Sequence, residues 1–344
     1  MLRRVKAILW NEQVHRPRLL WRLLALIAVV ALLGTFASVA VGFVSGGPIE
    51  SLLVLFSPGQ PIEQAIIAAR NLLFVSTQLV VMVGSVYLAG RFVDRRQFRD
   101  FGFRFDSAWW IDLGFGLALG AVLMTGIFIV ELVAGWVTVQ ELFYIARPDF
   151  AFWPWFVWGF LTFVSVGIYE ELLFRGYLIT NLSEGFTWFR RVETASAIGL
   201  ATFVTAVFFG VAHAGNPNST IASALGIVLA AFMLAAGYVL TGELAIPIGI
   251  HITWNFFQGV VYGFPVSGTT NGVSLIAINQ SGPAVITGGS FGPEAGVIGV
   301  VATLIGIGSI VAWVKWRGHD VRFDRSIIVP ELRQSQLESP EESR

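Results

Sequence analysis

The chain has 344 residues, of which 55% are hydrophobic and 13% are charged, and its mean hydropathy is +0.73. Because an ordinary soluble domain carries about 25% charged residues, this composition predicts a polytopic membrane protein. The absence of cysteine excludes disulfides, a thiolate nucleophile and zinc held by thiolates, and the formal net charge of zero implies no nucleic-acid partner.

In chain order, a basic segment over 1–22 precedes the first long apolar run, which is too long for the core of a signal peptide. A membrane helix needs about 20 mostly apolar residues. By that measure the sequence predicts an all-α, polytopic transmembrane helical bundle of about eight spans. The predicted spans are 23–45, 71–90, 109–136, 151–178, 194–213, 219–240, 244–263 and 295–314.

The arginines predict the orientation of the bundle. Segments 1–22, 91–104, 190–191 and 315–325 are basic, whereas segments 46–70, 137–150 and 264–294 carry few positive charges. This alternation predicts a multi-pass protein of the cell membrane with both termini in the cytoplasm. The transmembrane domain then covers 23–314, and 315–344 is a cytoplasmic tail that we expect to be disordered. Segment 264–294 is expected to be an outer loop, with Pro293 and Glu294 opening the last helix.

One predicted span contains charged residues, which are costly to insert into a bilayer. Glu170, Glu171 and Arg175 follow an uncharged run, and a charge near the centre of a bilayer costs roughly 2.5–3.5 kcal/mol on insertion scales. Adjacent residues on a helix point about 100° apart, so the two glutamates cannot both face one site. Glu171 and Arg175 have the favourable i, i+4 spacing of an ion pair. Glu170 is then left to face a cavity, where a carboxylate can act as a general base on water.

Two further pairs lie on apolar segments. Phe209 and His213, and likewise His251 and Asn255, are spaced i, i+4 and therefore share a helix face. Each polar residue also has a purely structural explanation, as an ion pair or as an interhelical hydrogen bond. Their conjunction within predicted spans favours a functional site.

The three patterns together resemble the CPBP family. They read E-E-x-x-x-R from Glu170, F-x-x-x-H from Phe209 and H-x-x-x-N from His251, in that order. The family comprises CAAX prenyl endoproteases of the Ras-converting type, bacteriocin-processing and self-immunity proteins, and related Abi proteins. The resemblance covers about 150–260 in detail, which is the expected catalytic core, and the glycine-rich stretch 288–294 also looks like many prokaryotic members.

The resemblance implies an intramembrane endopeptidase with catalytic residues Glu170, His213, His251 and Asn255. Glu170 would activate water with the help of His213, and His251 and Asn255 would stabilise the oxyanion. Glu171, Arg175 and Phe209 would support them. The implied partners are the lipid bilayer and a peptide or membrane-anchored protein substrate, which is prenylated in CAAX-type members. The oligomeric state is left open.

The sequence leaves two possibilities for the metal dependence of the reaction. The sequence contains no H-E-x-x-H, and we expect a glutamate mechanism with no cofactor. The alternative is zinc held by Glu170, His213 and His251, which requires the fold to bring the three together.

Two other function classes account for the same polar residues. One is a non-catalytic membrane interaction or scaffold protein, in which the cluster locks the helices together. The other is a proton-coupled transporter with a relay of glutamate and histidine, although the sequence shows no inverted repeat. The catalytic hypothesis carries its own structural requirement. With alternating spans, Glu170 and His213 fall towards opposite sides of the membrane, so the helix must continue well past Glu170 or the segment after His213 must re-enter the bundle.

Overall fold

The computed structural model describes residues 9–11, 16–45, 62–148, 150–189 and 191–329. The chain divides into two compact units, residues 1–98 and 99–344. Within the described residues, seven helices have the length and apolar composition needed to cross a membrane, which confirms the predicted all-α, polytopic architecture. The predicted tail beyond residue 329 and the segment 46–61 lie outside the described residues.

The first unit contains two long helices that pack against each other, α2 (Leu19–Ser45) and α4 (Ile62–Leu88). α4 continues into a π-helical turn, Ala89–Val93, and a two-stranded ribbon pairs β1 (Trp10–Asn11) with β2 (Arg16–Pro17). Phe36 and Phe43 on α2 are about three-quarters exposed, as a helix surrounded by lipid allows.

The second unit begins within a 3₁₀ turn, Phe98–Phe101, and its first long helix is α5 (Ser107–Val133). The Asp106 side chain accepts a hydrogen bond from the backbone N of Trp109 at 2.8 Å and so caps this helix. α6 (Phe152–Glu171), a π-helical segment (Leu172–Ile179) and α7 (Thr180–Phe186) follow without a break in the helical backbone.

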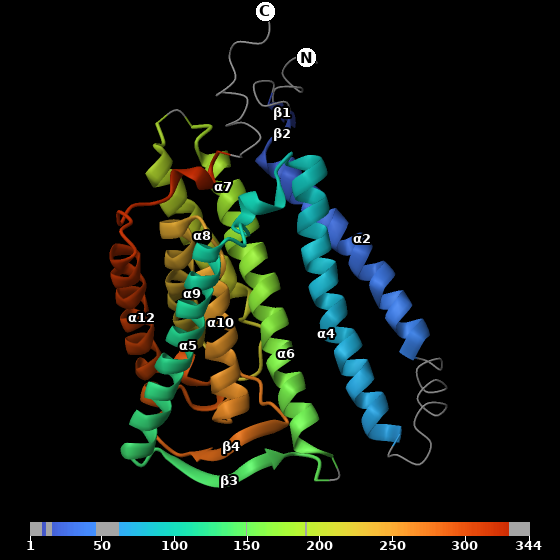
Figure 1. Ribbon diagram of the computed structural model, residues 1–344, viewed down its shortest axis with the longest axis vertical. Coiled ribbons are helices and arrows are strands. Elements are labelled where there is room, and N and C mark those ends of the chain that lie inside the picture. The colour runs from blue at the N-terminus through green and yellow to red at the C-terminus, as the bar shows by residue number, and fades with distance from the viewer. Residues whose placement is uncertain (1–8, 12–15, 46–61, 149, 190, 330–344) are drawn as a thin grey trace, which may run out of the picture. The chain divides into compact units, whose positions relative to one another are not determined.

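The remaining helices complete the bundle of the second unit (Figure 1). α8 (Thr194–Ala212) and α9 (Ile221–Thr241) are joined by a turn that ends in a capping box formed by Thr220 and Ser223. α10 (Ala245–Phe256) continues into a π-helical turn (Phe257–Val261), and α12 (Val297–Trp316) is the last long helix. Short turns lie between them and after them: α11 (Ala284–Thr287) and the 3₁₀ turns Gly289–Phe291, Pro293–Ala295 and Arg325–Ile327.

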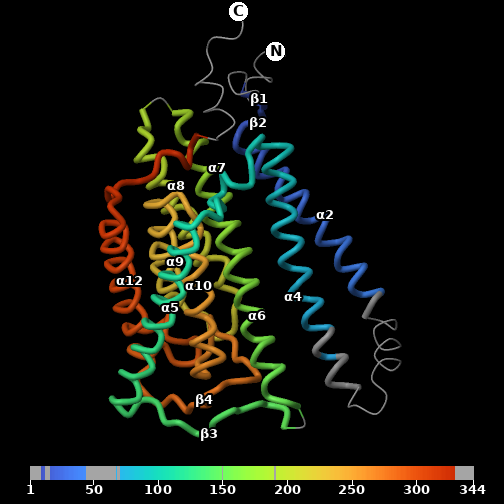
Figure 2. Tube along the Cα trace, in the orientation of Figure 1, coloured from blue at the N-terminus to red at the C-terminus, as the bar shows by residue number. Residues whose placement is uncertain are grey.

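Two segments that the sequence predicts only as loops form a small sheet. β3 (Val137–Ile145) pairs antiparallel with β4 (Val273–Gln280), from Val137 opposite Gln280 to Ile145 opposite Val273. Figures 1 and 2 show the two strands side by side at one end of this unit. The β-branched and aromatic residues of these segments suit a strand, but the pairing joins parts of the chain more than 120 residues apart.

The predicted span 244–263 corresponds to α10, which is buried along almost its whole length instead of facing lipid. It packs most closely on α5, where glycine is required. A Cβ atom on Gly249 would lie 2.6 Å from the carbonyl oxygen of Leu113 and 2.6 Å from the backbone N of Leu117. Small residues allow helix backbones to approach closely in membrane bundles. This contact fixes the position of the helix that carries His251.

Candidate active site

The helix that carries Glu170 continues well past it. Residues 152–186 form one run of helix, and Glu170 lies near its middle. The backbone changes to π-helical hydrogen bonding at Leu172, directly after the two glutamates, and such π segments occur frequently at functional sites. The structure thus meets the depth requirement of the catalytic hypothesis by extending this helix.

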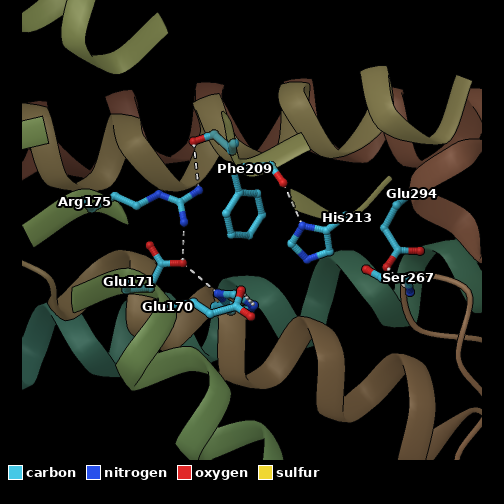
Figure 3. Close-up of polar contacts among 9 residues, drawn as sticks. Glu170, Glu171, Arg175, Phe209, His213, Ser267 and Glu294 are labelled. Atoms are coloured by element: carbon cyan, nitrogen blue, oxygen red, sulfur yellow. Dashed lines mark hydrogen bonds and ion pairs between the residues drawn. The ribbon is translucent and has the colours of Figure 1, made fainter. Parts of the chain in front are cut away.

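Glu171 lies at the centre of a buried polar network (Figure 3). Its Oε1 accepts a hydrogen bond from Arg175 Nη1 at 2.9 Å, the pair that the i, i+4 spacing predicts. The same oxygen lies 2.6 Å from His251 Nδ1, a contact that the sequence does not predict. Arg175 Nη2 also donates to the carbonyl oxygen of Ala231 at 3.3 Å. Because Glu171 is fully buried and Arg175 is 2% exposed, each needs the other as a counter-charge.

His251 connects the two glutamates. Its Nδ1 faces Glu171, and its Nε2 lies 3.8 Å from Glu170 Oε2. A carboxylate only accepts hydrogen bonds, so Nδ1 carries a proton and the ring is held with Nε2 toward Glu170. The 3.8 Å separation is longer than a hydrogen bond, but catalytic contacts often tighten only when substrate binds.

His213 ends α8 and is oriented by its own helix. Its Nδ1 lies 2.7 Å from the carbonyl oxygen of Phe209, which can only accept a hydrogen bond. Nδ1 therefore carries the proton, and in the neutral ring Nε2 is the free acceptor. The Phe209 ring lies between two groups: its centroid is 4.5 Å from the Arg175 guanidinium and 4.6 Å from the His213 ring centroid. Figure 3 shows this order of Arg175, Phe209 and His213.

The turn after His213 packs against the segment that follows α10. Asn216 Nδ2 donates to the carbonyl oxygen of Ser267 at 2.9 Å. Asn218 Nδ2 approaches the carbonyl oxygens of Gly268 at 3.5 Å and Ser290 at 3.3 Å. Irregular backbone at membrane depth is tolerated where it lines a cavity, and this turn does so through Asn216.

All four predicted catalytic residues line one cavity of about 160 Å³. Glu170, His213, His251 and Asn255 reach it from α6, the end of α8 and α10. A water molecule occupies about 30 Å³ in the liquid, so the cavity has room for several waters. Its other walls are largely apolar. They include Phe163, Met233, Leu234, Ile250, Trp254 and Val266.

Glu294 is a cavity residue whose place the sequence does not reveal. We expected it in the first turn of the last helix, but Pro293–Ala295 is a separate 3₁₀ turn and α12 begins at Val297. Glu294 is instead 6% exposed and lines the cavity. Burial raises the pKa of its carboxyl group to about 7, although hydrogen bonds from Gln258 and Ser267 oppose the rise. Gln258 and Ser267 are 36 and 27 residues away in the chain, so no local sequence pattern predicts their contacts with Glu294.

The residues of the zinc alternative are Glu170, His213 and His251. Among the residues that the structure describes, no three His, Asp or Glu side chains are arranged to hold a metal ion, so this set does not fit a zinc centre as it stands.

Comparison with known families agrees with the position of this cavity. Residues 152–257 match a family model whose description is type II CAAX prenyl endopeptidase Rce1-like. The matched segment contains all four predicted catalytic residues and ends before Ser267 and Glu294. No curated protein and no solved structure is significantly similar to the chain.

Proposed function

We propose that this membrane-embedded peptidase, a member of the Rce1-like CAAX endopeptidase family through its residues 152–257, cleaves its substrate with a water molecule activated by Glu170. The observation that carries the proposal is the position of His251, with Nδ1 against Glu171 and Nε2 facing Glu170 at the wall of the cavity. A scaffold would not require one histidine to be oriented by one carboxylate toward a second.

The reaction follows from these positions. A water held between Glu170 and His213 Nε2 attacks the carbonyl carbon of the substrate, and its proton passes to Glu170. The developing oxyanion accepts hydrogen bonds from His251 Nε2–H and from Asn255 Nδ2. The C–N bond then breaks, and the proton on Glu170 passes to the leaving amine. Preorganised donors of this kind are worth about 2.7–4 kcal/mol each in a site that excludes bulk water.

Glu171 and Arg175 act one step away from the substrate. The carboxylate of Glu171 accepts the Nδ1 proton of His251 and stabilises positive charge on that ring. Arg175 supplies the counter-charge for Glu171 in this buried position. A positively charged His251 is the form that donates from Nε2 to the oxyanion.

We further propose that the cell membrane houses the enzyme with its basic end in the cytoplasm. The segment before α5 and the turn after α9 meet at one end of the second unit. There the backbone N of Leu244 donates to the carbonyl oxygen of Gly102, and Arg104 forms a 2.7 Å ion pair with Glu243. The tail after α12 reaches the same end, where Asp324 N bonds Val239 O. The basic residues of the segment before α5 and of the tail therefore belong to one end of the second unit, as the positive-inside rule requires; they are Arg104, Lys315, Arg317, Arg322 and Arg325. We propose a membrane-anchored peptide as substrate, with a prenylated CAAX peptide as the first candidate to test.

The test uses the full chain in detergent with internally quenched peptides, with and without a prenyl group. We expect Glu170→Gln to lower kcat by at least about 10³-fold, because the base is lost. Glu131→Gln is the matched control, because Glu131 is also a buried glutamate but does not line the cavity. Full activity of Glu170→Gln would refute the mechanism. Loss of activity with chelator and its recovery with zinc would show that the enzyme needs a metal.

A further inference from the structure

We infer that Glu294 is a specificity residue that selects a substrate with a cationic side chain beside the scissile bond and disfavours a carboxylate there. This inference rests on the proposed function, because it names the substrate class of the same cavity. Figure 3 shows Glu294 on the far side of His213 from Glu170, so it lies away from the attacking water and near a neighbouring part of a bound peptide.

The structure holds the Glu294 carboxylate in a fixed position. Gln258 Nε2 donates to Oε2 at 2.6 Å, and the backbone N of Ser267 donates to Oε1 at 3.3 Å. Gln258 Nε2 is itself fixed by a bond to the carbonyl oxygen of Pro265 at 2.6 Å. A carboxylate offers about four acceptor positions, so these two bonds leave acceptor capacity for a substrate.

The neighbouring backbone is shaped around this carboxylate. Gly292 has φ +115°, a conformation that favours glycine, and a Cβ atom there would lie 2.5 Å from Glu294 Oε2 and 2.8 Å from Gln258 Nε2. The backbone at Gly292 therefore packs directly against the Glu294 carboxyl group and the Gln258 amide.

The charge of the cavity gives the sign of the selection. Its described lining contains two carboxylates, from Glu170 and Glu294, and no lysine or arginine. The nearby Arg175 lies behind Phe209 and is already paired with Glu171. Among the described lining residues, the basic side chains are those of His213 and His251. An ionised Glu294 attracts ammonium or guanidinium groups and repels carboxylates, so the part of the cavity beside it selects a cationic side chain.

The experiment compares peptides that differ at one position. Each has Lys, Gln or Glu within two residues of the scissile bond, and kcat/KM is measured for the full chain in detergent at a pH above the pKa of about 7 of Glu294, where its carboxyl group is ionised. We expect the wild type to prefer Lys over Glu by at least about 10-fold, and Glu294→Gln to reduce that ratio by about 10-fold. A tenfold change in the ratio corresponds to about 1.4 kcal/mol of differential binding.

Glu131→Gln is a close control, because Glu131 is likewise buried and likewise accepts from a glutamine, Gln280 Nε2 at 2.7 Å, outside the cavity. It should keep the wild-type ratio. If Glu294→Gln does not fold, Thr269→Lys places a cation at an exposed position of the cavity wall and should also reduce the preference for Lys.

The outcomes separate the two proposals. If the wild type cleaves, Glu170→Gln does not, and both Glu294→Gln and Thr269→Lys keep the wild-type Lys to Glu ratio, then the role of Glu294 is wrong and the proposed function stands. A wild type that cleaves Glu and Lys peptides equally also overturns the inference. If Glu170→Gln cleaves as well as the wild type, the proposed function itself fails.

Discussion

Replacing Glu171 by glutamine tests how the buried network is held together. The change keeps the shape of the side chain but removes the charge that Arg175 faces at 2.9 Å, with 0% and 2% of the two side chains exposed. A glutamine oxygen still accepts a hydrogen bond, but Arg175 becomes an uncompensated buried cation. Breaking a buried pair from one side costs about 3–5 kcal/mol, so we expect a loss of that order in the free energy of unfolding.

The assay is unfolding by titration of detergent micelles with SDS, for Glu171→Gln, Arg175→Met and the double variant. Because the double variant leaves no unpaired charge, we expect it to lose at least about 2 kcal/mol less than the sum of the single losses. Asp320→Asn makes the same acid-to-amide change in a pair with Arg322 that is 80% and 76% exposed, and it should have no measurable effect. Strictly additive losses, or a loss for Glu171→Gln as small as that for Asp320→Asn, would refute this account of the network.

Two further predictions concern the frame around the site. Gly249→Ala should lower kcat by about 10²-fold, because the added Cβ meets the backbone of α5 and displaces the helix that carries His251. Gly114→Ala is the control and should be neutral, because nothing lies within 4 Å of its added Cβ. Equal activity of the two variants would contradict this account. Burial raises the pKa of Glu243, in the turn after α9, from 4.5 to about 7 against the opposing effect of Arg104. The native state then binds more protons than the unfolded state between those values, so stability should fall as pH rises from about 4.5 to 7. In a thermal unfolding series, Glu243→Gln should remove part of that fall, and an identical pH profile in both proteins would refute it.

The local patterns of the sequence were sufficient for the membrane architecture and for singling out Glu170, His213, His251 and Asn255, which all line the cavity. Long apolar runs predict membrane helices from local sequence alone, because a helix makes all its backbone hydrogen bonds within the segment and can therefore lie in lipid. The i, i+4 spacing placed Glu171 beside Arg175 and His251 beside Asn255 for the same local reason. These relations depend only on helix geometry.

Other features depend on contacts between distant segments. The strands β3 and β4 pair residues more than 120 positions apart, and their sequences read as loops. The bond of His251 to Glu171 and the burial of Glu294 against Gln258 and Ser267 also cross between elements. No period or spacing encodes such contacts.

The sequence by itself therefore determined that this is a helical membrane protein and which residues of the candidate site share a helix face. Only the tertiary structure decided how those helices meet: that one histidine lies between two glutamates, that the helix runs on past Glu170, and that a glutamate from a distant turn joins the cavity wall. The physical reason is that helix propensity and hydrophobicity act over a few residues. The register of one helix against another is instead set by close packing, as at Gly249 against α5.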